Sequence, residues 1–193
     1  GGGAREMIRD GLFEKFPMEA VFGAHNWPGM AAGQFALKPG PCFASSNEFR
    51  ITIRGKGAHA AMPHNGIDPV PVACQMVQAF QTIITRNKRP IDAGVISVTM
   101  IHAGEATNVV PDTITMRVDR RLIPEEKGLK VERELIALVK RAAKGKGAQG
   151  KGIKVDCRRV IMAEPLKPRP GVKKIVEILQ RHAKRELKVA IKE

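Results

Sequence analysis

Residues 47–160 alternate between strand-like and helix-like patterns in an order that few folds accommodate. Apolar and polar residues alternate over 49–53, which is the period-two pattern of a strand with one buried face. After a loop, Asp68 and Pro69 suit the N-cap and the first position of a helix. The apolar stripe of that helix follows helical spacing and is expected to be core. Its members are Val70, Ala73, Cys74, Val77, Phe80 and Ile84.

The rest of this segment predicts three more strands and a second helix. The strands are expected at 95–101, 114–118 and 153–157, and the helix over 131–142. The order strand, helix, strand, strand, helix, strand is the split βαβ pattern. We therefore expect an α+β, ferredoxin-like domain with a four-stranded antiparallel sheet and both helices on one face. An open sheet edge in such a domain is a pairing site, which favours a dimer.

The segments on either side of this domain have a different character. Residues 1–12 open on glycines and look helical up to Gly11. A short buried strand is expected at 20–24. Residues 33–37 could pair with it as a hairpin, before a turn at 38–41. Residues 163–171 are rich in proline and look like a linker, and a basic helix is expected from Val172 onward. We expect three parts, 1–45, 46–162 and 163–193, of which the outer two are pieces of a larger domain.

Composition excludes some classes of protein and favours others. The chain has 193 residues and no apolar run of about 18 residues, so we expect a cytoplasmic protein without a membrane partner. The formal charge of +14 would suit a polyanion, but the few aromatic residues do not interleave with the basic runs as base-stacking platforms would, so nucleic acid is not the expected partner. Cys42, Cys74 and Cys157 are odd in number and far apart, which favours free thiols.

The stretch 55–69 contains two histidines, His59 and His64, in a loop bounded by glycine and proline. An imidazole in such a loop can donate a hydrogen bond, carry a proton or bind a metal, although both could equally be surface residues without chemistry. His25 follows the predicted strand at 20–24, where side chains often reach a site. His102 and His182 are expected to be structural or surface residues.

Four segments together resemble a known family. They are GGGAREMIRDGLF, AHNWPG, GKGAHAAMPHNGIDPV and AGEATNVVPD, and they occur in the family's order over the first 112 residues. The family is that of the dinuclear-zinc amidohydrolases, which includes hippurate hydrolase, aminoacylase and acetylornithine deacetylase. The segment MRVDRRLIPEE at 116–126 is more similar to the acetylornithine and succinyl-diaminopimelate deacetylases, which leaves the acyl specificity open.

The resemblance implies a function and a set of site residues. It implies metal-dependent hydrolysis of the amide bond of N-acyl amino acids, with two metal ions, expected to be zinc, per full-length subunit. It also implies that residues 46–162 match a ferredoxin-like lid domain, inserted into the catalytic domain, through which a homodimer forms. His25 matches a metal ligand, and His59 and Asn108 match lid residues that contact the scissile carbonyl in the partner subunit. Arg121 matches an arginine that meets a substrate carboxylate, and His64 is the rival of His59. A hydrogen-bond donor such as His59 would stabilise the oxyanion that develops during attack by a metal-bound water.

This sequence offers one recognisable metal ligand, whereas a zinc site needs three or four. We therefore expect the 193-residue chain alone neither to retain the metal nor to hydrolyse amides. Two other functions stay open at this point: a non-catalytic dimerisation module, and a basic nucleic-acid-binding domain.

Overall fold

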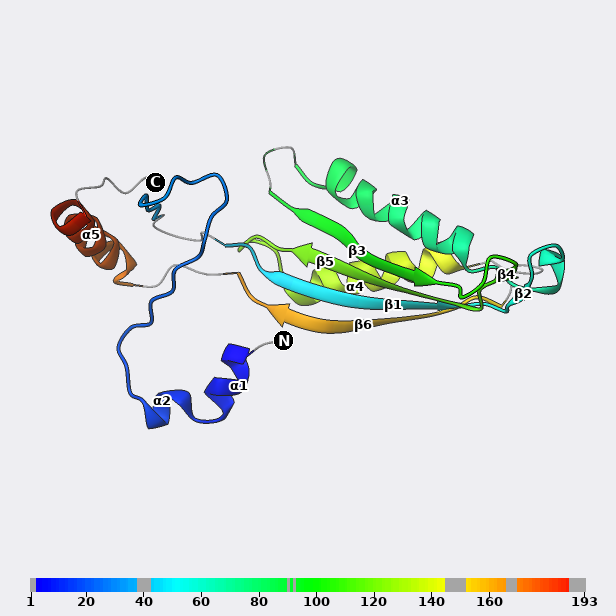
Figure 1. The fold of residues 1–193 in the computed structure, drawn as a ribbon, viewed down its shortest axis with the longest axis horizontal. Helices are drawn as coiled ribbons and strands as arrows, with labels where there is room; N and C mark the ends of the chain where they lie inside the picture. Colours follow the sequence, from blue (N-terminus) through cyan, green and yellow to red (C-terminus); the bar gives the residue numbers. More distant parts are fainter. Residues whose placement is uncertain are drawn as a thin grey trace. The chain divides into compact units, whose positions relative to one another are not determined.

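The computed structural model describes residues 3–37, 43–89, 91, 93–144, 152–165 and 170–187. At its centre, four strands form one antiparallel sheet in the order β3-β5-β1-β6, and two helices cover one face of it (Figure 1). This is the expected ferredoxin-like arrangement, which the structure confirms. The elements are β1 (Ser46–Arg54), α3 (Val70–Asn87), β3 (Val95–Ala103), β5 (Thr113–Arg121), α4 (Gly128–Ala143) and β6 (Lys154–Ala163).

The core lies between the sheet and the two helices. In the central strands β1 and β5 every second side chain is buried, because successive residues of a strand point to opposite faces. The helices contribute one apolar stripe each, and the opposite sheet face is polar. The buried core residues are Phe49, Ile51 and Ile53 of β1, Ile114, Met116 and Val118 of β5, Val72, Ala73, Met76 and Phe80 of α3, and Leu135 and Val139 of α4.

Helix α3 begins one residue later than the sequence predicts, and its buried stripe is placed differently. Pro69 is the N-cap and Val70 the first helical residue, and the Asp68 carboxylate accepts a hydrogen bond from the backbone N–H of Val70 at 2.8 Å. The predictions that Val70 and Cys74 belong to the core are wrong, because both side chains are exposed. Each residue advances by about 100° around a helix, so a stripe centred on Met76 turns Cys74 toward solvent.

The chain divides into two compact units, Phe43–Leu166 and the pair of segments Gly1–Cys42 with Lys167–Glu193. The second unit contains α1 (Gly3–Arg9), α2 (Leu12–Lys15), α5 (Val172–His182) and a π-helical turn at Ala183–Leu187. A helix near the start of the chain and another from Val172 are confirmed.

The predicted strand at 20–24 is wrong, and so is its hairpin. These residues form no strand, and the side chains of Val21 and Phe22 are 72% and 68% exposed. A short apolar run becomes a strand only when another strand pairs with it, and within the described residues none does. The expected turn at 38–41 and part of the expected linker at 163–171 lie outside the described residues.

No helix in the described part of the chain is long and apolar enough to cross a membrane.

Candidate functional site

Two short strands bring His59 and Asn108 together. Strand β2 (Ala58–His59) pairs antiparallel with β4 (Val109–Val110), so that His59 lies opposite Val109. The backbone N–H of Ala60 donates to the carbonyl oxygen of Asn108 at 2.8 Å. We call β2 and β4 the tip ribbon, because they lie at the end of the sheet where β1 ends and β5 begins (Figure 1).

Backbone hydrogen bonds tie the tip ribbon to the sheet. The N–H of Gly55 donates to the carbonyl of Asp112 at 2.7 Å, and Lys56 and Ile67 exchange two hydrogen bonds of 2.9 and 2.8 Å. Backbone hydrogen bonds therefore hold the two ends of the His59 loop together and fix it to the sheet. These hydrogen bonds help to offset the conformational entropy that is lost when the loop backbone is ordered.

Gly55 is the residue at which this loop leaves β1. A Cβ atom at this position would overlap the carbonyl oxygen of Ile67, which is one of the oxygens that hold the loop. The close approach of two backbone segments therefore requires glycine at position 55.

We expect Gly55→Ala to lower the free energy of unfolding by about 1–3 kcal/mol, because the added methyl group forces the two backbone segments apart. Urea denaturation of the 193-residue chain, followed by circular dichroism, measures the change. Gly23→Ala is the matched control, because a Cβ at Gly23 meets nothing within 4 Å. Equal stability of the two variants would contradict the assignment of Gly55 to a tight backbone contact.

The hydrogen bond of the His59 ring defines where its proton lies. Its Nδ1 accepts from the backbone N–H of Ala61 at 3.1 Å, so Nδ1 carries the lone pair. In a neutral imidazole the proton is then on Nε2. The His59 side chain is exposed, so this Nε2–H can donate to a group outside the ribbon.

The same loop contains the second histidine. His64 lies in a 3₁₀ turn at Pro63–Asn65 and is exposed, as is Asn108 in the turn immediately before β4. The tip thus gathers three of the residues that the sequence predicts for the site, namely His59, His64 and Asn108.

Arg121 lies at the opposite end of the sheet. It is the last residue of β5, and eight residue steps of about 3.4 Å put it roughly 27 Å along the strand from Thr113 at the tip. We call this end the base of the sheet, because β1 begins there and Ser45 exchanges hydrogen bonds with Leu122. The Arg121 Nε donates to the Asp119 carboxylate at 2.6 Å, so the two residues form an ion pair at the end of the strand. The structure does not bring Arg121 to His59 of the same chain.

His25 belongs to the other unit and has a ring suited to a metal ligand. Its Nδ1 lies 2.6 Å from the carbonyl oxygen of Asn26, and because a carbonyl only accepts, Nδ1 carries the proton. In this tautomer Nε2 carries the lone pair, as in histidines that bind a metal through Nε2. The ring also packs edge-on against Trp27 at 6.2 Å between ring centroids.

The described residues do not fit a complete metal centre. No three His, Cys, Asp or Glu side chains of the described ranges gather as a metal site requires. Cys157 is not a ready ligand either, because burial, and after it the carboxylates of Asp156 and Glu132, raise the pKa of its thiol to about 11. A thiol with this pKa is protonated at neutral pH, and a metal binds the thiolate.

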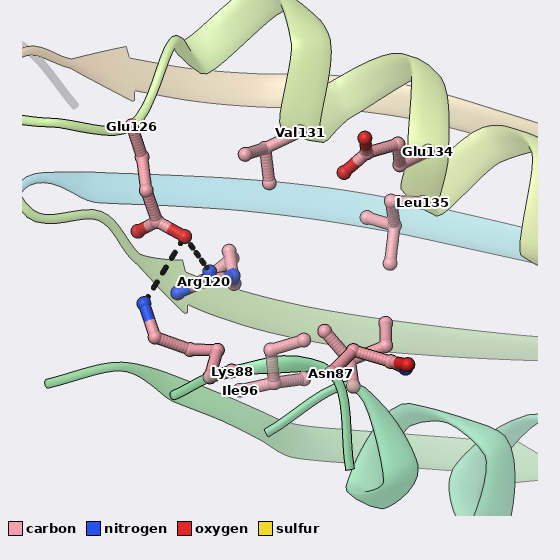
Figure 2. Close-up of a pocket in the computed structure, with 9 residues that line it drawn as sticks. Asn87, Lys88, Ile96, Arg120, Glu126, Val131, Glu134 and Leu135 are labelled. Carbon is pink, nitrogen blue, oxygen red and sulfur yellow. Dashed lines mark hydrogen bonds and ion pairs between the residues drawn. The ribbon is translucent and has the colours of Figure 1, made fainter. Parts of the chain in front are cut away.

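A cluster of charged residues at the base was not predicted from the sequence. Glu126, in the turn before α4, contacts both Arg120 and Lys88 (Figure 2). Lys88 follows α3 and is 38 residues from Glu126, so no local spacing signals the contact. The cluster lines a cavity that is described below.

Comparison with known proteins gives the family. Residues 45–147 match the family model of the peptidase dimerisation domain, M20_dimer. The chain is 40% identical to an N-acetyl-L-cysteine deacetylase of Bacillus subtilis over 138 residues, which are 72% of this chain and 33% of that protein. It is 37% identical to the hippurate hydrolase of Campylobacter jejuni over 139 residues, which are 72% of this chain and 36% of that protein. The chain thus spans about a third of the length of the curated relatives that it matches.

Solved structures support the same fold. A putative aminohydrolase from methicillin-resistant Staphylococcus aureus matches with a TM-score of 0.72 and 22% identity over 92% of this chain and 46% of that chain. A dinuclear metal binding peptidase of the M20 family from Bacillus subtilis matches with a TM-score of 0.63 and 24% identity over 98% of this chain and 45% of that chain. The sheet, its two helices and the match over more than half of the sequence agree, and the chain belongs to the M20 peptidase dimerisation domain family.

Proposed function

We propose that this chain supplies the lid and dimerisation part of a metal-dependent hydrolase that cleaves the amide bond of N-acyl amino acids. The observation that supports this most is the tip ribbon, which holds His59 beside the turn of Asn108 and leaves the Nε2–H of His59 free to donate. The deacetylase and hydrolase names of the relatives support the reaction class. In this proposal residues 46–162 form the lid, and residues 1–45 and 163–193 belong to the catalytic domain.

The tip residues have distinct roles in this proposal. His59 donates its Nε2–H to the carbonyl oxygen of the scissile amide, where negative charge develops in the transition state, and Asn108 contacts the same oxygen. His64 contacts the substrate from the neighbouring turn. The ring of His59 needs no rearrangement for this, because the Ala61 N–H already holds its Nδ1 as an acceptor.

The proposed cofactor is a pair of divalent metal ions, with zinc as their proposed identity. His25 would supply one imidazole nitrogen, and the remaining ligands would have to come from outside the described residues. On this basis the 193-residue chain alone is expected to be inactive.

The separation of Arg121 from His59 has a consequence for the site. One small substrate cannot contact two side chains of the same lid that lie at opposite ends of the sheet. We propose that Arg121 serves the site of its own chain, where its guanidinium pairs with the substrate carboxylate, while His59 and Asn108 reach the site of the partner subunit. A bidentate guanidinium suits a carboxylate.

The two edges of the sheet differ in how well they suit pairing between subunits. The edge strand β3 exposes the apolar residues Val95, Met100 and Ile101 by about half each (48%, 48% and 51%). The other edge, β6, exposes Arg158 and Arg159, and charged residues on an edge oppose strand pairing. We propose that the homodimer forms through β3, whose last residues lie next to the tip ribbon.

We expect Ile101→Lys to convert a dimer into monomers, because it places an ammonium group in the middle of the apolar pairing edge. Sedimentation velocity of the 193-residue chain over a range of concentrations measures the effect, and the dissociation constant should rise by at least a hundredfold. Val160→Lys on β6 is the matched control, since Val160 is similarly exposed at 44%. Loss of the dimer with Val160→Lys, but not with Ile101→Lys, would contradict the proposal, because it would place the interface on β6 and not on β3.

The reaction itself is tested on the full-length protein. We expect release of a free amino acid from N-acetyl and N-benzoyl amino acids, measured by an amine-detecting reagent, in the presence of a divalent metal. Addition of a chelator should abolish this release. Amide hydrolysis that persists without metal, or no hydrolysis of any N-acyl amino acid by the metal-loaded protein, would contradict the proposal.

A further inference from the structure

The base of the sheet contains a small cavity between the end of α3 and the start of α4. Its volume is about 120 Å³. Figure 2 shows Lys88, Arg120 and Glu126 gathered on one side of it, with Val131 and Leu135 of α4 and Ile96 of β3 among its apolar lining. The cavity is far from the tip ribbon and has no role in the proposed reaction.

The charges that line the cavity do not balance. Glu126 Oε1 lies 2.6 Å from the Arg120 guanidinium and 3.2 Å from the Lys88 ammonium, so two cations share one oxygen atom. Its second oxygen accepts from the backbone N–H of Ile123 at 3.1 Å. The side chains of Arg120, Lys88 and Glu126 are only 3%, 10% and 20% exposed, so these three described residues together hold one excess positive charge largely away from water.

Glu134 lines the cavity but does not supply the missing negative charge. Its side chain is 62% exposed, and its carboxylate lies 3.8 Å from the ammonium of Lys130 on the outer side of α4. A charge in contact with water and with its own partner is screened and contributes little to the buried cluster.

Two groups beside the cavity have N–H donors for which the described residues supply no acceptor. The Nε of Arg120 is buried, and within the described ranges no acceptor lies in reach of it. The ammonium of Lys88 has three N–H groups, and the described residues supply one acceptor for them, Glu126. Buried donors in folded proteins are satisfied in the great majority of cases, so these two groups point to a bound anion.

We propose that this cavity binds a short-chain carboxylate. One carboxylate oxygen accepts from the Nε–H of Arg120 and the other from the ammonium of Lys88, which supplies both missing acceptors and cancels the excess charge. The alkyl group packs against Ile96, Val131 and Leu135. A water molecule occupies about 30 Å³ of liquid, so the cavity has room for about four waters or for an ion of four or five non-hydrogen atoms. Acetate and propionate have this size, and inorganic anions lack the apolar part.

The experiment is a titration of the 193-residue chain with sodium propionate at constant ionic strength. Nuclear magnetic resonance follows the Nε–H signal of Arg120 and the methyl signals of Ile96. We expect both to shift and saturate with one dissociation constant, on the order of 1 mM because so small a ligand makes few contacts. Sodium chloride and sodium phosphate are titrated in the same way, and neither should saturate these signals.

Lys88→Met tests the residues. It keeps an unbranched side chain that is one atom shorter, removes one cation, and should weaken propionate binding at least tenfold. Lys140→Met removes an exposed lysine in the last turn of α4, which does not line this cavity, and should leave the affinity unchanged. Three results would overturn the proposal: no saturable shift with propionate, saturation by chloride or phosphate with equal affinity, or unchanged propionate binding by Lys88→Met. None of these results depends on the amidohydrolase reaction, so the two proposals fail separately.

Discussion

Replacement of His59 by alanine in the full-length protein should lower kcat for N-acyl amino acids by about 10²–10³-fold, with little change in KM. The reason is that a preorganised donor to a developing oxyanion is worth far more in the transition state than in the ground state, and loss of one such donor has effects of this size. The tip ribbon orients the donor, since the N–H of Ala61 occupies Nδ1 and leaves the proton on Nε2. Steady-state kinetics measure the loss, and metal analysis should show that the metal content is unchanged.

His64→Ala is the matched control, since His64 is exposed in the turn that follows His59. We expect its kcat to fall by less than about tenfold, because within the described residues nothing fixes the tautomer of its ring. A large loss with His64→Ala and a small one with His59→Ala would exchange the two roles. Long-range proton–nitrogen correlation spectra of the 193-residue chain provide a readout without activity: the ring of His59 should show an unprotonated Nδ1 and a protonated Nε2.

The sheet domain could be predicted from the sequence because its elements are long and periodic. β1 and β5 alternate strictly, and their buried face follows from that alternation. The prediction was wrong at 20–24, where an apolar run gives the same local signal as a buried strand but has no strand to pair with among the described residues. It was also wrong for Cys74, because the orientation of a helix is decided by the sheet on which it packs and not by its own spacing.

The candidate site could be predicted only in part. The histidine loop stands out by composition, but strands of two residues have no period, so the pairing of β2 with β4 could not be read from the sequence. The separation of Arg121 from His59 follows from the length of β5 once its pairing with β1 is known. The cluster of Lys88, Arg120 and Glu126 depends on how a helix end meets a turn, and no local pattern predicts such a contact.

The second large effect concerns the distribution of the site over two subunits. Full-length proteins with His59→Ala or Arg121→Met should each be nearly inactive as homodimers. If Arg121 acts in its own subunit and His59 in the partner's, a mixed dimer has one site with both residues intact and one with neither. Random mixing of equal amounts gives half mixed dimers, so about a quarter of the wild-type activity should return.

Two controls keep this result interpretable. Mixing each variant with a double variant that carries both substitutions should restore no activity, because no intact site can form. Introducing Ile101→Lys into both single variants should prevent recovery, since the proposed β3 interface is then lost.

The measurement that tests the central claim most directly is therefore the specific activity after subunits of the His59→Ala and Arg121→Met proteins are exchanged. The two ends of this sheet, one with a histidine at its tip and one with an arginine at its base, are expected to complete the sites of different subunits. Recovery to about a quarter of wild-type activity is the predicted result. Exchange that demonstrably forms mixed dimers, yet leaves the activity at the level of the two variants alone, would contradict it.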